Sequence, residues 1–211
     1  VIMWGWGAMN AGAITEAVKT KYPMNQFVGV WWSGHDGDMK LVGDAGKGYR
    51  SISWSVPNSE SGLMQDIKKY VVDAGKSQIN QGEGEFDSVF YQRGLMISLM
   101  LVEGIKVAQD HFDVRAPNPE QLRWGLENIK LDEARLKELG ADGMLVPFST
   151  SCSNHTGHGG GWILEWDGAK FVKASDLLQP DRAEIEPLEL EKAKEYADAN
   201  APWPVNEECK M

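Results

Sequence analysis

Two short apolar runs near the start of the chain have the lengths of buried strands. They are residues 1–7 (VIMWGWG) and 27–32 (FVGVWW). Between them, residues 10–19 combine alanines with spaced aliphatic side chains, as a helix does, and Pro23 follows the end of that pattern. A strand, a crossover helix and a second strand make a βαβ unit, so this region predicts a parallel sheet.

The carboxyl ends of these two strands predict a ligand site. In open α/β sheets, ligands bind in the crevice beyond the carboxyl ends of the parallel strands. Tryptophans stand at both of these ends, and we expect them to form the wall of a site; ordinary core packing is the alternative. The candidate ligand-binding residues here are Trp4, Trp6, Gly7, Trp31, Trp32 and His35.

The middle of the chain is mainly helical in pattern. Residues 49–56 alternate between polar and apolar and predict a third strand, whereas residues 61–74 predict an amphipathic surface helix. The longest helical pattern covers residues 86–112. Between Leu95 and Val102 it contains a single polar residue, so we expect this helix to be buried nearly all round.

The last third of the chain predicts short helices and a hairpin. Helices are expected from Asn118, a good N-cap, to Glu127, and again over residues 132–139. The glycine- and serine-rich residues 147–161 predict a connection. After it, residues 162–166 and 170–173 flank Asp167-Gly168, a strong hairpin signal, and residues 184–200 predict an acidic helix.

Composition narrows the classes of partner. The chain has 211 residues, of which 42% are hydrophobic and 25% charged, an ordinary globular mixture. A net charge of -10 argues against a nucleic-acid surface, because a phosphate backbone would be repelled. We therefore expect a small-molecule partner. Nine tryptophans also favour a ligand cleft, where indole supplies a flat wall with one donor.

One segment resembles a catalytic or metal site but lacks the expected support. Residues 151–158 (SCSNHTGH) bring together a thiol, hydroxyls and two histidines. A nucleophile needs a base and an orienting group on rigid elements, which a glycine-rich connector does not supply. A metal held by Cys152, His155 and His158 would lack a fourth ligand. Because no phosphate loop or dinucleotide fingerprint occurs either, we expect no enzyme activity, no metal and no cofactor.

The two cysteines, Cys152 and Cys209, are too few for a disulfide scaffold. A single pair in an exported protein often forms one bridge, which here would tie the irregular tail to the connector. In the chain-entropy model such a bridge would stabilise the fold by about 4 kcal/mol. Two free buried thiols are the alternative.

The order of these elements resembles the C-terminal half of periplasmic solute-binding proteins of the branched-chain amino-acid class. Three stretches carry the resemblance: residues 1–22, residues 42–48 (VGDAGKG) before the third strand, and residues 162–168 (WILEWDG). It covers nearly the whole chain. Because the chain begins within a strand pattern, we expect it to be a fragment that lacks the N-terminal half.

The resemblance implies the type I periplasmic-binding-protein fold, with two Rossmann-like α/β lobes of mostly parallel sheets. Residues 1–56 and 162–211 would form one lobe, and residues 57–161 would form part of the other. The chain would cross between the lobes near Trp54–Asn58 and His155–Trp162. A ligand would be held between the lobes.

The resemblance also bears on the ligand. In that family an acidic residue after the second strand pairs with an amino group, whereas this chain has Trp31 or Trp32 there. A buried ammonium without a carboxylate costs several kcal/mol. A flat or apolar solute, such as an aromatic or branched carboxylate, is therefore expected rather than a typical zwitterionic amino acid. Tyr91 and Arg93 match a place where the family presents cleft residues, so Arg93 is a candidate carboxylate partner; a surface-paired arginine is the alternative.

These observations favour the solute-binding component of an ABC importer in the periplasm. Its partners would be a small organic solute, an aromatic or branched carboxylate or an amino-acid-like compound, and the membrane permease subunits of the transporter. A ligand-sensing receptor ectodomain with the same fold is the alternative, and an enzyme is the third class. Ligand-dependent lobe closure without turnover would separate binding from catalysis.

Overall fold

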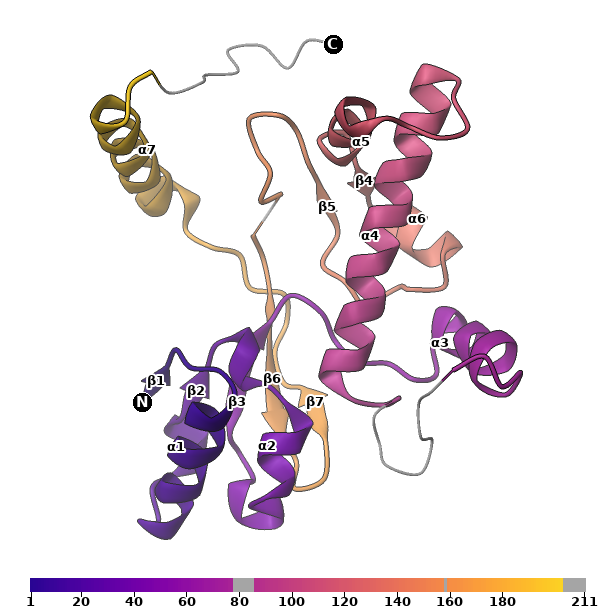
Figure 1. The fold of residues 1–211 in the computed structure, drawn as a ribbon. Coiled ribbons are helices and arrows are strands. Elements are labelled where there is room, and N and C mark those ends of the chain that lie inside the picture. The colour runs from indigo at the N-terminus through magenta and orange to yellow at the C-terminus, as the bar shows by residue number, and fades with distance from the viewer. Residues whose placement is uncertain (78–85, 158, 203–211) are drawn as a thin grey trace.

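A mixed five-stranded sheet lies beside a mainly helical region in the computed structural model, which describes residues 1–77, 86–157 and 159–202 (Figure 1). The strand order is β1-β2-β3-β6-β7. The first three strands are parallel, and β6 and β7 add an antiparallel hairpin at one edge. The bounds are β1 Ile2–Met3, β2 Val28–Gly29, β3 Arg50–Ser53, β6 Trp162–Trp166 and β7 Phe171–Lys173. The predicted α/β class and all the predicted strands are confirmed.

Helices and turns on the sheet enclose the first hydrophobic core. Helix α1 (Ala8–Lys19) is the predicted crossover between β1 and β2, and helix α2 (Asp36–Lys40) follows a 3₁₀ turn at Trp31–Ser33. Further 3₁₀ turns lie at Met24–Gln26 and Gly43–Gly46. The buried apolar residues of this core are Ile14, Met24, Phe27, Met39, Tyr49, Val89, Leu164, Trp166 and Phe171.

A second core lies in the helical region. Helix α3 (Gly62–Ile67) continues into a π-helical turn at residues 68–72. Helices α4 (Val89–Phe112), α5 (Pro119–Leu126) and α6 (Glu133–Glu138) follow, with Asn118 forming the capping box of α5. The buried apolar residues of this core are Met64, Met96, Ile129, Leu131, Leu136, Ala141, Met144 and Leu145.

A second, two-stranded sheet joins β4 (Lys130–Leu131) to β5 (Phe148–Ser149). The sequence predicted only a connection from residue 147 onward. Backbone pairing of Leu131 with Phe148 gives this part of the connection a fixed place against the second core. A glycine- and serine-rich composition therefore did not exclude a short strand at the start of the segment.

Helix α4 is the longest helix and contributes to both cores. Val89, in its first turn, belongs to the first core, whereas Met96 belongs to the second. The expectation that α4 is buried nearly all round is wrong: Ile97 is 54%, Leu101 46% and Val102 53% exposed. The described residues pack against only one side of the helix, so its apolar pattern overstated its burial.

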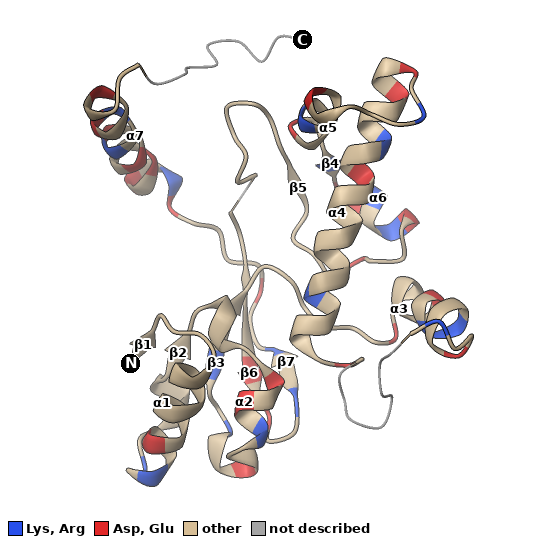
Figure 2. Cartoon of the chain, viewed as in Figure 1, with Lys and Arg blue, Asp and Glu red and all other residues tan. Residues whose placement is uncertain are grey.

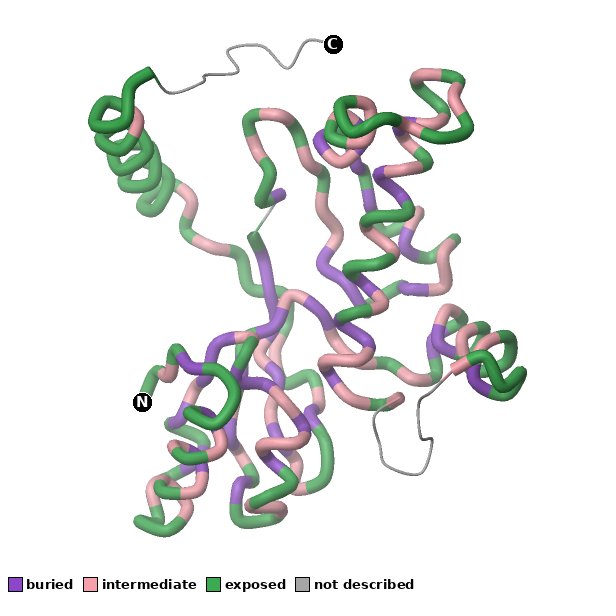
Figure 3. Tube along the Cα trace, in the orientation of Figure 1, coloured by how far each residue is buried: buried purple, intermediate pink, exposed green. Residues whose placement is uncertain are grey.

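The last described helix, α7 (Arg182–Ala199), confirms the predicted acidic helix, and none of its residues is buried (Figure 3). Acidic and basic residues follow one another along α7 (Figure 2). Cys209 lies outside the described residues, so the disulfide to Cys152 stays a prediction. Across the described part of the chain, each helix is too short or too polar to span a membrane.

Two segments connect the sheet region with the helical region. Ser55, after β3, forms an isolated antiparallel bridge with Leu145, and the backbone N–H of Val146 donates to the carbonyl of Trp54 at 3.2 Å. The second segment joins β5 of the two-stranded sheet to β6 of the five-stranded sheet. The division of the chain at residues 56–57 and 161–162 stays a prediction.

Candidate functional site

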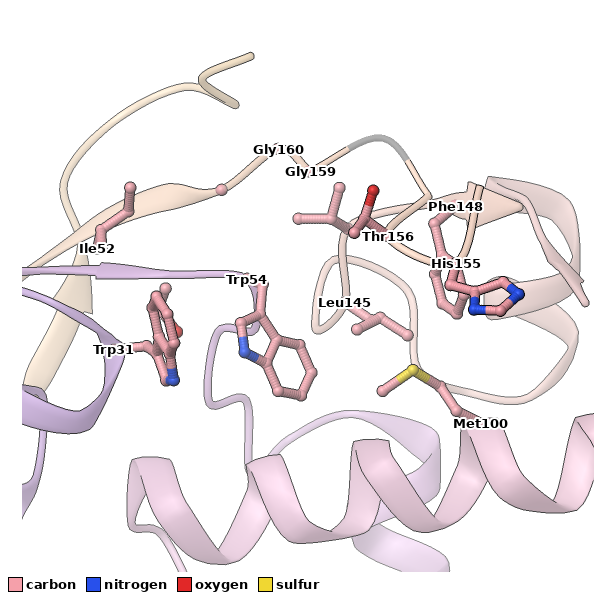
Figure 4. A pocket seen from close by; sticks show the side chains of 13 residues that line it. Trp31, Ile52, Trp54, Met100, Leu145, Phe148, His155, Thr156, Gly159 and Gly160 are labelled. Atoms are coloured by element: carbon pink, nitrogen blue, oxygen red, sulfur yellow. The ribbon is translucent and has the colours of Figure 1, made fainter. Parts of the chain in front are cut away.

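A cavity of about 540 Å³ lies between the sheet and the second core (Figure 4). The walls come from the turn after β2, the end of β3, helix α4, the segment before β5 and the approach to β6. Apolar and aromatic side chains dominate, as in small-molecule sites. The lining residues are Trp31, Ile52, Ser53, Trp54, Met100, Leu145, Val146, Phe148, His155, Thr156, Gly159, Gly160 and Gly161.

Two indole rings, those of Trp31 and Trp54, lie side by side in one wall of the cavity (Figure 4). Trp31 follows β2 and Trp54 follows β3. Because β2 and β3 are parallel, with Gly29 opposite Ser51, both residues emerge at the same edge of the sheet. The cavity thus occupies the crevice at the carboxyl ends of parallel strands, where the sequence predicted a site.

Buried hydrogen bonds hold the turn that carries Trp31. The Asn10 side-chain amide donates to the carbonyl of Trp32 at 2.9 Å, and the Ser33 hydroxyl donates to the carbonyl of Gly5 at 3.0 Å. The Tyr49 hydroxyl donates to the carbonyl of Ser33 at 2.9 Å. Satisfied buried polar groups of this kind specify one backbone path, so the wall of the cavity is preorganised.

Arg93 lies behind this wall and is buried, being 5% exposed. Its Nη1 donates to the carbonyl of Trp31 at 2.7 Å, and its Nη2 donates to the Ser53 hydroxyl at 3.0 Å. Nε has no hydrogen-bond partner among the described residues. Burial lowers the pKa of Arg93 to about 10, although the negative charge of Asp36 acts to raise it. The alternative of a surface-paired arginine is therefore not observed, and the guanidinium joins the ends of β2 and β3 to α4.

An aromatic cluster surrounds Phe90, next to Arg93. The guanidinium lies 5.2 Å from the Phe90 ring and 5.6 Å from the Trp54 ring. His35 stacks on Phe90 at 4.6 Å between ring centroids, and Trp32 meets Phe90 edge-on at 5.9 Å. Four predicted residues, Trp31, Trp32, His35 and Arg93, thus gather here, although only Trp31 lines the cavity.

The other predicted ligand residues lie further from the cavity. Trp4 is 78% exposed and meets Trp31 edge-on at 5.8 Å, and Trp6 is 66% exposed. Gly7 precedes α1 with a φ of 55°, a conformation that favours glycine. Tyr91 packs against Phe86 at 5.7 Å, on the side of the second core.

Asp36, at the start of α2, is a buried carboxylate. It accepts a hydrogen bond from the backbone N–H of Val89 at 2.8 Å, at the start of α4. An anion is stabilised at a helix N-terminus, which explains the placement. Burial nevertheless raises the pKa of Asp36 above its ordinary value. No acidic side chain is among the described residues that line the cavity.

Asp36 is expected to make stability depend on pH. Because its pKa is higher in the folded protein, its stabilising contribution is fully present below the unfolded pKa and is lost as the pH rises through the folded pKa. Asp36→Asn retains an acceptor for Val89 but cannot ionise, so it should flatten this loss. Denaturant midpoints measured from about pH 4 to about pH 7 test this. Asp110→Asn, on the exposed side of α4, is the control, and an Asp36→Asn profile that still falls like the wild type would contradict the assignment.

Sequence reasoning missed Trp54, Phe90 and His155 as site residues. The signal for Trp54 was present, because it ends the third predicted strand just as Trp31 ends the second. Phe90 belongs to the same helix as Tyr91 and Arg93, which the resemblance indicated instead. His155 was considered only as a catalytic or metal residue.

The structure gives no support to a metal centre in the described residues, which hold no suitable group of three histidine, cysteine or acidic side chains. His158 lies outside the described residues. His155 Nε2 instead lies 3.3 Å from Oε1 of Glu127. The hydroxyls of Ser151 and Ser153 are 3.2 Å apart in a turn.

The sheet, the helical region and the cavity between them have the type I periplasmic-binding-protein fold, as the similar solved structures show. A crystal structure described as an ABC transporter permease from the Pseudomonas fluorescens group is 33% identical, with a TM-score of 0.90 over 100% of this chain and 50% of that one. No protein-family model matches the sequence, and no curated protein matches it significantly.

Two further solved structures share the fold. A branched-chain amino-acid ABC transporter protein from Thermus thermophilus with bound valine is 19% identical, with a TM-score of 0.66 over 88% of this chain and 48% of that one. An ABC transporter solute-binding protein from R. palustris in complex with benzoate is 16% identical, with a TM-score of 0.52 over 85% of this chain and 44% of that one. The chain thus spans about half the length of these proteins, in agreement with the resemblance read from the sequence.

Proposed function

We propose that this chain is part of a solute-binding protein of an ABC importer, which captures a small organic solute between two lobes. The apolar cavity at the carboxyl ends of β2 and β3 carries the proposal. Its volume of about 540 Å³ is in the range of small-molecule sites. The solved structures with the same fold include proteins with bound valine and bound benzoate.

The cavity favours a flat or branched carboxylate over a zwitterionic amino acid. An ammonium group in a closed site needs a carboxylate partner, because an unpaired buried charge costs several kcal/mol. The described lining has no acidic side chain, and Asp36 is engaged with Val89. The Trp31 and Trp54 rings offer faces on which an aromatic or conjugated body can stack.

The exposed apolar side of α4 supports the proposed lobe division. Ile97, Leu101 and Val102 lie on this side, and the similar solved structures extend over about twice the length of this chain. We infer that the N-terminal half of the protein covers this side and completes the lobe formed in part by residues 57–161. Residues 1–56 and 162–211 form the other lobe in this arrangement.

Import requires delivery to a membrane, so the partners in this proposal are the permease subunits of an ABC transporter and the location is the periplasm. A receptor ectodomain with the same fold is the alternative, and a membrane-spanning segment in the same polypeptide would distinguish it. Neither role requires an enzyme or a cofactor.

Ligand titration of the full-length protein tests the proposal. Benzoate and branched 2-oxo acids are expected to bind at least about tenfold more tightly than leucine or valine, because the cavity lacks an acid for the ammonium. Isothermal titration calorimetry measures the affinities, and mass analysis of each ligand after incubation checks that none is consumed. Tight binding of leucine, together with no detectable binding of the acids, would refute the proposed ligand class. Consumption of any ligand would refute the binding role.

A further inference from the structure

His155 is the single ionisable side chain among the described residues that line the cavity. It lies near Phe148, at the end of the cavity away from Trp31 and Trp54 (Figure 4). Arg93, behind the wall of the cavity, already donates to the carbonyl of Trp31 and to Ser53 and does not line the space. A charged group of a solute that stacks on the tryptophans therefore has His155 as its ionisable neighbour.

A buried carboxylate lies beside the His155 ring. Nε2 lies 3.3 Å from Oε1 of Glu127, whose side chain is 8% exposed. Arg123 Nε lies 3.8 Å from the same carboxylate oxygen. A histidine whose one nitrogen is held by a carboxylate presents its other nitrogen in a defined direction. Glu127 thus leaves Nδ1 of His155 as the nitrogen that is available to a ligand.

The segment that carries His155 is anchored, despite its glycines and serines. The Thr150 hydroxyl donates to the carbonyl of Leu126 at 2.6 Å, which ties the segment to the end of α5. The Asn154 side-chain amide donates to the carbonyl of Gly157 at 3.0 Å, and the Thr156 hydroxyl donates to Asn154 at 3.0 Å. These bonds fix the backbone on both sides of His155.

We propose that His155, positioned by Glu127, is the residue that recognises the acid group of the solute, and that an anion binds together with a proton on Nδ1. This inference rests on the proposed solute-binding function. With Nε2 directed at Glu127, a neutral ring offers a lone pair at Nδ1, which repels a carboxylate. Protonation turns Nδ1 into a donor, so the proton taken from solvent forms a charge-assisted hydrogen bond to the ligand.

The test pairs each acid with its uncharged amide in the full-length protein: benzoate with benzamide, and a branched 2-oxo acid with its amide. Calorimetry in two buffers of different ionisation enthalpy measures the protons taken up. The acids are expected to take up part of a proton on binding and the amides none. His155→Gln should weaken the acids about tenfold, abolish the uptake and leave the amides within about twofold. Glu127→Leu, which leaves no acceptor beside Nε2, should reduce the uptake through loss of ring positioning.

His111→Gln is the matched control, because His111 stacks on Trp124 away from the cavity. His155 is well exposed, so its variant should keep the wild-type melting temperature. Acid binding that takes up no proton and is unchanged in His155→Gln would overturn the inference and leave the binding function standing. Failure of every acid and amide to bind the wild-type protein would overturn both.

Discussion

Trp54→Ala is expected to weaken benzoate binding by about thirty- to a hundredfold, which corresponds to about 2–3 kcal/mol. The Trp54 ring is one of the two indoles in the cavity wall, and the guanidinium of Arg93 lies 5.6 Å from it. Truncation removes a stacking face and leaves a space that a small solute does not fill. Calorimetric titration of the full-length protein measures the loss.

Trp4→Ala is the matched control for this prediction. Trp4 is 78% exposed and does not line the cavity, so its replacement should change the affinity by less than about threefold. Trp54→Phe keeps an aromatic face and should recover most of the binding, which separates loss of the wall from loss of folding. If Trp4→Ala were the damaging variant and Trp54→Ala were silent, the site would lie at the end of β1, where the sequence first predicted part of it.

Gly125→Val is expected to destabilise the second core by about 3 kcal/mol or more. Helices α4 and α5 are in close contact here, and a Cβ on Gly125 would lie 2.2 Å from the carbonyl oxygen of Gly104 and 2.9 Å from Cβ of Ala108. The obstacle includes backbone, which cannot rotate away as a side chain can. Denaturant unfolding of the full-length protein should show the loss in the midpoint.

Gly12→Ala provides the opposite expectation. Gly12 is exposed in α1, and an added Cβ would meet no atom of the described residues within 4 Å. Alanine has the higher helix propensity, so this variant should gain up to about 1 kcal/mol. A Gly125→Val protein as stable as the wild type would show that the two helices pack less closely than described.

The sheet was predictable because its signals are local. The apolar runs at residues 1–7 and 27–32 and the Asp167-Gly168 turn each define an element within a few residues. The site was only partly predictable, because it depends on which strand ends meet at one edge. The rule that indicated Trp31 applies equally to Trp54, whereas nothing in the local sequence shows that Glu127 lies next to His155.

Burial was the least predictable property. The apolar segment between Leu95 and Val102 looks the same whether one side or all sides of the helix are covered, and the described residues cover one side. Asp36 shows the converse, since a charged residue in a glycine-containing turn is typically solvated. Its burial follows from the start of α4, 53 residues further along the chain, which needs an acceptor for the Val89 N–H.

Helix α4 connects the two hydrophobic cores as one continuous helix. Its N-terminal end is held to the sheet side by the hydrogen bonds of Val89 to Asp36 and of Arg93 to Trp31, whereas Met96 belongs to the other core. An unbroken helix resists bending, so a change in the angle between the cores cannot be absorbed along its length. Such a change has to break and remake the hydrogen bonds at the N-terminal end of the helix. Any change in the angle between the two cores therefore alters the hydrogen bond that Arg93 donates to the carbonyl of Trp31, in the wall of the cavity itself.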